Sequence, residues 1–243
     1  MEEINIDNYK CLTNRVLISI DKIFNNEISV GDVKLYLDTS YDPEKHTVCR
    51  GIVEKVCDKL YSGKFDGMEW TTDIEIKPGD EVYFTWMALD DALRKRTYFT
   101  CKGKVKAEMQ SGYVPCSYSD LTLAVRGKEI IMLNGYVLVE PLTKEEFEEK
   151  FLQVKTSELI IDMIRRQNMP GWGRVIACGT PNKEYQNIVY SDNVDVIPGD
   201  IVLFKKESDV AVQYDMHADL LGRKKLFKIQ RRHLMAKLEL PVE

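Results

Sequence analysis

The chain has 243 residues, of which 44% are hydrophobic and 30% are charged, and its formal net charge is -5. This balance predicts one or two globular domains, each with a hydrophobic core. A general nucleic-acid binder is not expected, because phosphate contacts need an excess of Lys and Arg. A membrane protein is not expected either, because the longest apolar runs are too short to span a bilayer.

The six cysteines show no pattern of a metal or redox site. None forms a CxxC pair, and no His lies at a zinc-ligand spacing from any of them. The sequence therefore predicts no metal site and reduced thiols. The segment Met1–Lys10 is acidic and polar, unlike a targeting segment, so we expect a cytoplasmic protein.

The same short motifs occur twice along the chain, in the same order. The matched pairs are Val16 with Val137 (an offset of 121), Gly51 with Gly173 (122), Gly79 with Gly199 (120) and, more loosely, Leu121 with Leu234 (113). Chance explains one such match but not an ordered series at nearly one offset. The sequence therefore predicts a duplicated module, with a first domain over residues 1–130 and a second over residues 131–243.

Each repeated block is typical of β structure. Val16–Ile18 and Val137–Val139 are β-branched runs too short for helices. The Pro-Gly-Asp steps predict turns that lead into strands over residues 81–84 and 201–204. We expect a mainly all-β fold, since short strands with regular turn signals favour barrels. Short helices are expected over residues 87–96, over 142–154 from a Thr-x-x-Glu capping box, and over 157–167.

The ordered motifs RVLI, GxV, PGDxVxF and DLxA resemble the co-chaperonin family, known as GroES or chaperonin 10. The resemblance covers about residues 12–126 and 132–240. It implies two tandem GroES-like irregular β-barrels, a homo-oligomeric ring, and capping of a GroEL-type chaperonin in an ATP-dependent complex that assists protein folding. It implies no cofactor. The sequences of the two copies look more like phage-encoded relatives than like standard bacterial ones. A phage-encoded protein of this family would be located in the host cytoplasm.

In that family, a hydrophobic tripeptide between the first strand and the GxV strand binds the chaperonin. The corresponding window of the first copy is residues 21–50, where Val33, Leu35 and Leu37 alternate with polar or aromatic residues. An extended chain with this alternation presents one apolar side, which fits docking into a groove. The alternative interpretation is a barrel edge strand whose apolar residues face their own core.

In the second copy, the corresponding window is residues 142–172. It places Leu159, Ile160 and Ile161 where the resemblance expects the chaperonin-binding tripeptide. Residues 158–166 are also compatible with a helix, so a helical insert packed on a neighbour is an equal alternative.

No enzyme is predicted. The chain has neither GxxxxGK[ST] nor GxGxxG, and neither HExxH nor GxSxG. Besides the co-chaperonin, a structural protein of a virion head or tail could reuse the same barrel, because a fold does not fix a function. An oligonucleotide-binding barrel is disfavoured by the net negative charge.

Overall fold

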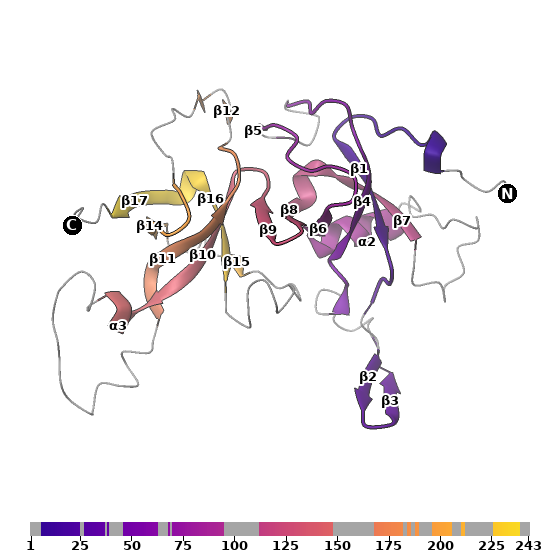
Figure 1. The fold of residues 1–243 in the computed structure, drawn as a ribbon, viewed down its shortest axis with the longest axis horizontal. Helices are drawn as coiled ribbons and strands as arrows, with labels where there is room; N and C mark the ends of the chain where they lie inside the picture. Colours follow the sequence, from indigo (N-terminus) through magenta and orange to yellow (C-terminus); the bar gives the residue numbers. More distant parts are fainter. Residues whose placement is uncertain are drawn as a thin grey trace. The chain divides into compact units, whose positions relative to one another are not determined.

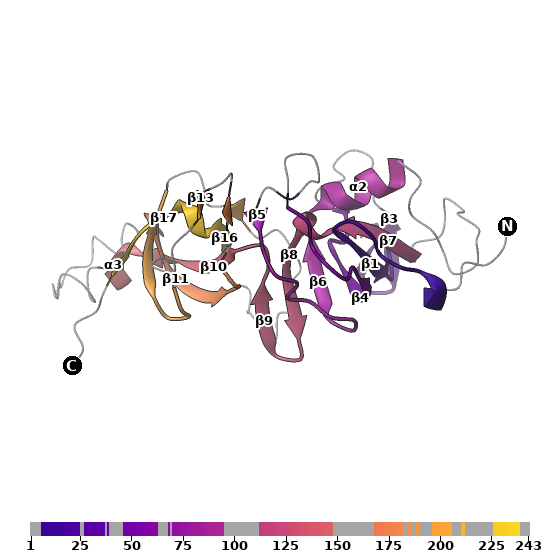
Figure 2. The same ribbon diagram turned by 90° about the horizontal axis from the view of Figure 1, so that it is seen from above.

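The computed structural model describes residues 6–24, 27–36, 38, 46–62, 68, 70–94, 112–147, 168–181, 184–185, 188–189, 196–205, 210–211 and 226–238. The chain divides into two compact units (Figures 1 and 2). Unit 1 comprises residues 1–134 and 182–189, and unit 2 comprises residues 135–181 and 190–243. Each unit contains a six-stranded antiparallel sheet, so the fold is mainly β.

Unit 1 is built on a sheet with the strand order β7-β1-β4-β6-β8-β9. Its elements are η1 (Ile6–Asn8), β1 (Arg15–Ile20), β2 (Glu27–Val30), β3 (Val33–Tyr36), β4 (Arg50–Val56), β5 (Trp70–Thr71), β6 (Glu81–Phe84), α2 (Trp86–Arg94), β7 (Gly112–Ser117), η2 (Tyr118–Asp120), β8 (Leu121–Arg126), β9 (Glu129–Met132), β12 (Glu184–Tyr185) and β13 (Ile188–Val189). Strands β13, β12 and β5 form a small separate sheet, and β2 pairs only with β3.

Unit 2 is built on a sheet with the strand order β15-β16-β10-β11-β14-β17. Its elements are β10 (Tyr136–Thr143), α3 (Lys144–Phe147), β11 (Asn168–Cys178), β14 (Ile201–Phe204), β15 (Val210–Ala211), β16 (Phe227–Gln230), η5 (Arg231–His233) and β17 (Leu234–Leu238).

Five strands occur in the same order in the two units, β7-β1-β4-β6-β8 in one and β16-β10-β11-β14-β17 in the other. The places where the register of strand pairing shifts also correspond between the two units. The pairing of β1 with β4 shifts after Leu17, and the pairing of β10 with β11 shifts after Leu138. A second shift follows Tyr83 in β6 and Leu203 in β14. The repeat in the sequence is therefore also a repeat in the structure.

The glycine of each GxV motif lies where the central strand crosses the first strand. A Cβ at Gly51 would overlap the side chain of Ile18, and a Cβ at Gly173 would overlap the side chain of Val139. Ile18 and Val139 are fully buried in the cores of their units. Glycine is needed at these positions because only it allows the two backbones to approach so closely.

The Pro-Gly-Asp turns have the same geometry in both units, as the duplication predicts. Gly79 and Gly199 have φ angles of 92° and 98°, in the left-handed region that favours glycine. The N–H of Gly79 donates to the carbonyl of Val53 at 2.8 Å, and the N–H of Gly199 donates to the carbonyl of Val175 at 2.8 Å. Each turn is thereby fixed to the GxV strand of its own unit.

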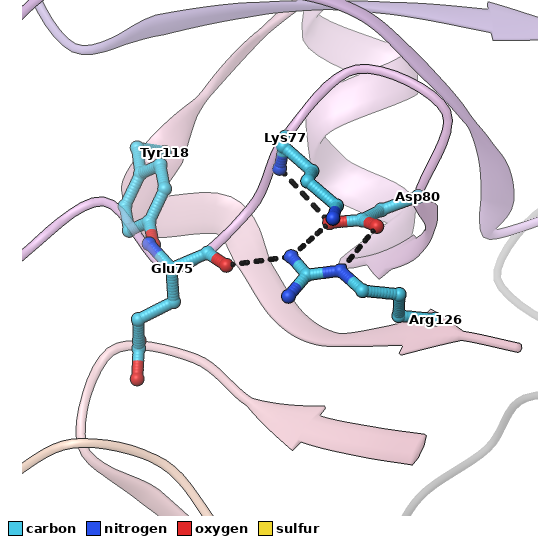
Figure 3. A network of polar contacts seen from close by, with 5 residues as sticks. All are labelled: Glu75, Lys77, Asp80, Tyr118 and Arg126. Carbon is cyan, nitrogen blue, oxygen red and sulfur yellow. Dashed lines mark hydrogen bonds and ion pairs between the residues drawn. The ribbon is translucent and has the colours of Figure 1, made fainter. Parts of the chain in front are cut away.

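In unit 1, the aspartate of this turn is the centre of a polar network (Figure 3). The buried carboxylate of Asp80 accepts hydrogen bonds from Arg126 at 2.9 and 2.7 Å and from the N–H of Lys77 at 2.9 Å. Arg126 also donates to the carbonyl of Glu75 at 3.1 Å. Burial alone would raise the pKa of Asp80, but the hydrogen bonds from Arg126 and Lys77 outweigh it and hold this pKa below its ordinary value.

Unit 2 keeps the same turn with a lysine as the partner of the aspartate. The carboxylate of Asp200 accepts the N–H of Ile197 at 2.8 Å and pairs with Lys237 at 2.8 Å. The ammonium of Lys237 is a point charge, whereas the guanidinium of Arg126 binds its carboxylate through two hydrogen bonds. The carboxylate is therefore held more tightly in unit 1.

The helix predictions are confirmed in part where the structure describes the chain. Of the helix predicted over residues 142–154, residues 142–143 instead end strand β10, and Lys144–Phe147 form α3. Helix α2 covers the helix predicted over residues 87–96 up to Arg94. The capping box is present before α3, because the N–H of Glu146 donates to the hydroxyl of Thr143 at 3.2 Å and the N–H of Thr143 donates to Glu146 at 3.0 Å. Residues 148–167 lie outside the described residues. Within the described part of the chain, no helix is long and apolar enough to cross a membrane.

We expect Asp80→Ala to destabilise unit 1 by about 2–3 kcal/mol, because it leaves Arg126 and the N–H of Lys77 without their acceptor. Asp200→Ala is the matched control and should cost about 1 kcal/mol, since Asp200 is less buried than Asp80 and pairs with a lysine through one contact rather than with an arginine through two. Urea unfolding measures the loss, and hydrogen exchange of peptides over 50–56 and 172–178 assigns it to a unit. Equal losses for the two variants would contradict the role given to Arg126.

Candidate interaction site

The window between the first strand and the GxV strand of unit 1 contains a β-hairpin. Strands β2 and β3 pair in the register Glu27 with Tyr36 and Val30 with Val33. The two-residue turn between them begins with Gly31, whose φ angle is 60°. A glycine with positive φ at the first turn position is typical of the tight hairpin turns that match strand twist. Strand β2 was not predicted from the sequence, although Gly-Asp between two β-branched residues is a hairpin signal.

One face of this hairpin is apolar and exposed. Residues that lie opposite each other in an antiparallel pair project to the same side, and residues alternate along each strand. Val30, Val33 and Leu35 therefore share one face, which we call the apolar face. Their exposed fractions are 62%, 59% and 52%. The interpretation of an edge strand that faces its own core does not hold for Val33 and Leu35, because both side chains are exposed.

The opposite face of the hairpin carries polar and aromatic side chains. Lys34 Nζ lies 3.3 Å from a carboxylate oxygen of Glu27, and both groups are exposed to solvent. An exposed pair of this kind stabilises the hairpin by only a few tenths of a kcal/mol. Tyr36 is 72% exposed. The hairpin thus has two chemically different faces on one short ribbon.

The chain enters and leaves this window at one place on unit 1. The N–H of Val48 donates to the carbonyl of Ile23 at 2.9 Å, and Phe24 forms an isolated antiparallel bridge with Thr47. Ile23 is buried in the core cluster and Phe24 packs against it. The base of the window is therefore held by the core, while the apolar face is exposed.

The structure brings two of the residues predicted to bind the chaperonin, Val33 and Leu35, onto one face. It adds Val30, which the sequence analysis did not single out. Leu37 lies outside the described residues. Leu159, Ile160 and Ile161 of the second copy also lie outside them.

Chemically reactive groups are not gathered in the described part of the chain. There, no group of three His, Cys, Asp or Glu side chains is arranged to hold a metal ion. Cys11, Cys57 and Cys116 are buried free thiols, and burial raises the pKa of each. A raised pKa leaves little thiolate, which is the reactive form.

Comparison of the chain with protein-family models gives no match, and comparison with curated protein sequences gives none either.

We expect Gly31→Val to weaken the hairpin and leave the six-stranded sheet of unit 1 intact. A β-branched residue in the left-handed region costs about 1–2 kcal/mol. Nothing lies within 4 Å of a Cβ built at Gly31, so the cost comes from the backbone alone. Hydrogen exchange should become faster over residues 27–36 and stay unchanged over β1 and β4. Gly51→Ala is the contrast, because its Cβ meets Ile18 and should destabilise the whole unit. Loss of unit 1 in the Gly31 variant would show that the hairpin is part of the fold.

Proposed function

We propose that the chain is a co-chaperonin-like protein. It consists of two tandem GroES-like β-barrels, forms a homo-oligomeric ring, and caps a GroEL-type chaperonin in an ATP-dependent complex that assists protein folding. The shared five-strand order and the matching Pro-Gly-Asp turns support the tandem arrangement. The ordered motifs RVLI, GxV, PGDxVxF and DLxA support the resemblance.

The observation that carries the proposal is the exposed apolar face of the β2–β3 hairpin. Val30, Val33 and Leu35 are each more than half exposed, on a short ribbon without a core of its own. A contiguous exposed apolar surface is typical of a binding site. The hairpin lies in the window in which the co-chaperonin resemblance places the chaperonin-binding segment. An apolar groove on a chaperonin is a suitable acceptor for these three side chains.

A folded hairpin suits a contact that has to form and break repeatedly. Pairing of β2 with β3 meets part of the ordering cost before binding, which an irregular loop would meet only on binding. The contact of one hairpin remains weak because its apolar face is small. Several hairpins on one ring raise the total avidity by orders of magnitude, and all are released together when the chaperonin changes state.

The rest of the proposal concerns the chain's other properties. Leu37 and, in the second module, Leu159, Ile160 and Ile161 are proposed as further chaperonin contacts. The protein carries out no chemistry and needs no cofactor, metal, nucleic acid or membrane. Its location is the cytoplasm, which is the host cytoplasm if a phage encodes it.

One observation favours a second candidate, a structural protein of a virion head or tail. Residues 27–36 form a regular two-stranded ribbon, which is also suited to lasting contact with a neighbouring subunit. Under this alternative, the apolar face is covered in the assembled particle and no chaperonin is involved.

Two lysine substitutions test whether chaperonin binding depends on the apolar face or on the hairpin as a whole. Leu35→Lys places a charge in the apolar contact and should lower chaperonin binding at least about tenfold. Tyr36→Lys is the matched control on the opposite face, next to its register partner Glu27, and should bind like the wild type. Co-sedimentation with a GroEL-type chaperonin in the presence of ATP measures both.

Two different outcomes would count against the assignment. Binding of the Leu35 variant at the wild-type level would remove the apolar face from the contact. Binding of neither variant nor the wild type would favour the structural alternative. Circular dichroism and light scattering should show that both variants keep the fold and the oligomer of the wild type.

A further inference from the structure

Two buried thiols of unit 1 lie in a small apolar cluster apart from the main core. The cluster consists of Cys11, Leu17 and Cys57, which are 3%, 0% and 5% exposed. Leu17 stands between Val16 and Ile18 in β1, and both of these neighbours belong to the main core. Successive side chains of a strand point to opposite faces of a sheet. The cluster with the two thiols therefore lies on the face opposite to the main core.

The segment that precedes β1 covers this cluster. Ile6 and Tyr9 are partly buried and pack against it, and Cys11 is part of it. We call residues 6–14 the N-terminal cover. Apart from the short turn of η1, the cover belongs to no helix or strand, so it is not part of the ladder of the six-stranded sheet. Segments of this kind open locally at a lower free energy than paired strands do.

Two consecutive residues of the N-terminal cover bracket Cys57. Lys10 Nζ pairs with the carboxylate of Asp58 at 2.9 Å. The thiol of Cys11 donates to the carbonyl of Lys55 at 3.5 Å. Cys57 lies between Lys55 and Asp58 in the chain and shares the buried cluster with Cys11. The two thiols are therefore neighbours on one face of the sheet.

The electrostatics of the thiols agree with this placement. Burial is the main cause of the raised pKa of Cys11, and the nearby thiol of Cys57 raises this pKa further. The effect of one charge on another falls with distance, so it is felt only between neighbouring groups.

Asn14 anchors the end of the N-terminal cover next to β1. Its side-chain amide donates to the carbonyl of Tyr61 at 2.7 Å, and its side-chain oxygen accepts the N–H of Tyr61 at 2.6 Å. Asn14 is 1% exposed. When residues 6–11 open and close about this anchor, Cys11 returns to the same place beside Cys57.

The other cysteines that the structure describes are placed differently. Cys116 belongs to the main core on the opposite face of the sheet. Cys49 precedes β4, whereas Cys57 follows it, and the thiol of Cys49 donates to the carbonyl of Thr47. Cys178 belongs to unit 2. Among the described residues, only Cys11 and Cys57 are two thiols of one cluster.

We propose that Cys11 and Cys57 form a reversible disulfide under oxidising conditions, and that this disulfide locks the N-terminal cover onto the sheet of unit 1. The thiols are free in the reduced protein, as the structure has them. The inference goes beyond the proposed function. It concerns unit 1 alone and holds or fails independently of chaperonin binding.

The oxidant we assign is a small disulfide such as oxidised glutathione. Local opening of the cover exposes Cys11 to water, and its thiol loses a proton to solvent. The thiolate attacks one sulfur of the oxidised glutathione, which gives a mixed disulfide and releases one glutathione thiolate. The thiolate of Cys57 then attacks the sulfur of Cys11 and releases the second glutathione. Two protein thiols are thus oxidised while one glutathione disulfide is reduced to two thiols, and an excess of reduced glutathione reverses both steps.

Peptide mapping after equilibration with glutathione tests the bond directly. The protein is incubated at several ratios of oxidised to reduced glutathione, blocked with N-ethylmaleimide and digested with trypsin. We expect the peptides 11–15 and 56–59 to be joined, with the loss of two hydrogens, in an amount that rises with this ratio and vanishes after reduction. Oxidation in urea is the control, because unfolded chains should pair all six cysteines without this preference.

Three results of this mapping would each overturn the proposal. They are thiols that stay unreacted at every ratio, mixed glutathione disulfides alone, and a preferred bond between any other two cysteines in the folded protein.

Hydrogen exchange tests the lock. Oxidation should slow exchange over residues 6–14 at least about tenfold, because the bond prevents local opening of the cover. Cys57→Ser and Cys11→Ser each remove the bond from one side, so neither variant should respond to the oxidant. Cys49→Ser is the matched control and should respond like the wild type, and circular dichroism checks that all variants fold. Exchange that is equally fast in the oxidised and the reduced wild-type protein would contradict the lock.

Discussion

Each unit depends on the attachment of one tight turn to one central strand. Gly79 and Gly199 adopt a backbone conformation that other residues rarely take, and their N–H groups bind the carbonyls of Val53 and Val175. The carboxylate that follows the glycine then fixes the turn from the other side, most tightly where Arg126 binds Asp80 through two hydrogen bonds. The GxV strand pairs with the first strand on its other side, so the turn determines where β1, β4 and β6 lie relative to one another.

This attachment fixes the strands of the sheet and leaves the window between β1 and β4 available for binding. Strands β1 and β4 are fixed in the sheet, and the window between them is closed at its base by contacts of Ile23 and Phe24. In the hairpin inside the window, the side chains of Val30, Val33 and Leu35 are exposed and so add nothing to the core of unit 1. The hairpin can therefore carry an apolar face that a core strand would have to bury.

Much of the fold could be predicted from the sequence, because each motif occurs twice and the second copy supports the interpretation of the first. The strands over residues 81–84 and 201–204, the two Pro-Gly-Asp turns and the Thr143 capping box all have the predicted structure. The site was predicted less completely. Alternation of Val33 with Lys34 indicates a strand but not its partner, and β2 was missed because its own four residues show no clear period. The pairing of Asp80 with Arg126 was not predictable, since it joins residues 46 positions apart that meet only after the sheet has formed.

The central claim is that the apolar face of the hairpin binds a chaperonin, and hydrogen exchange of the wild-type protein in the complex tests it most directly. The protein is mixed with a GroEL-type chaperonin with and without ATP, and exchange is followed over residues 27–36. The account predicts a complex that forms with ATP and slows exchange in this hairpin, with little change in the sheet of unit 1. A complex that leaves residues 27–36 unprotected, or the absence of any complex with ATP, would contradict it.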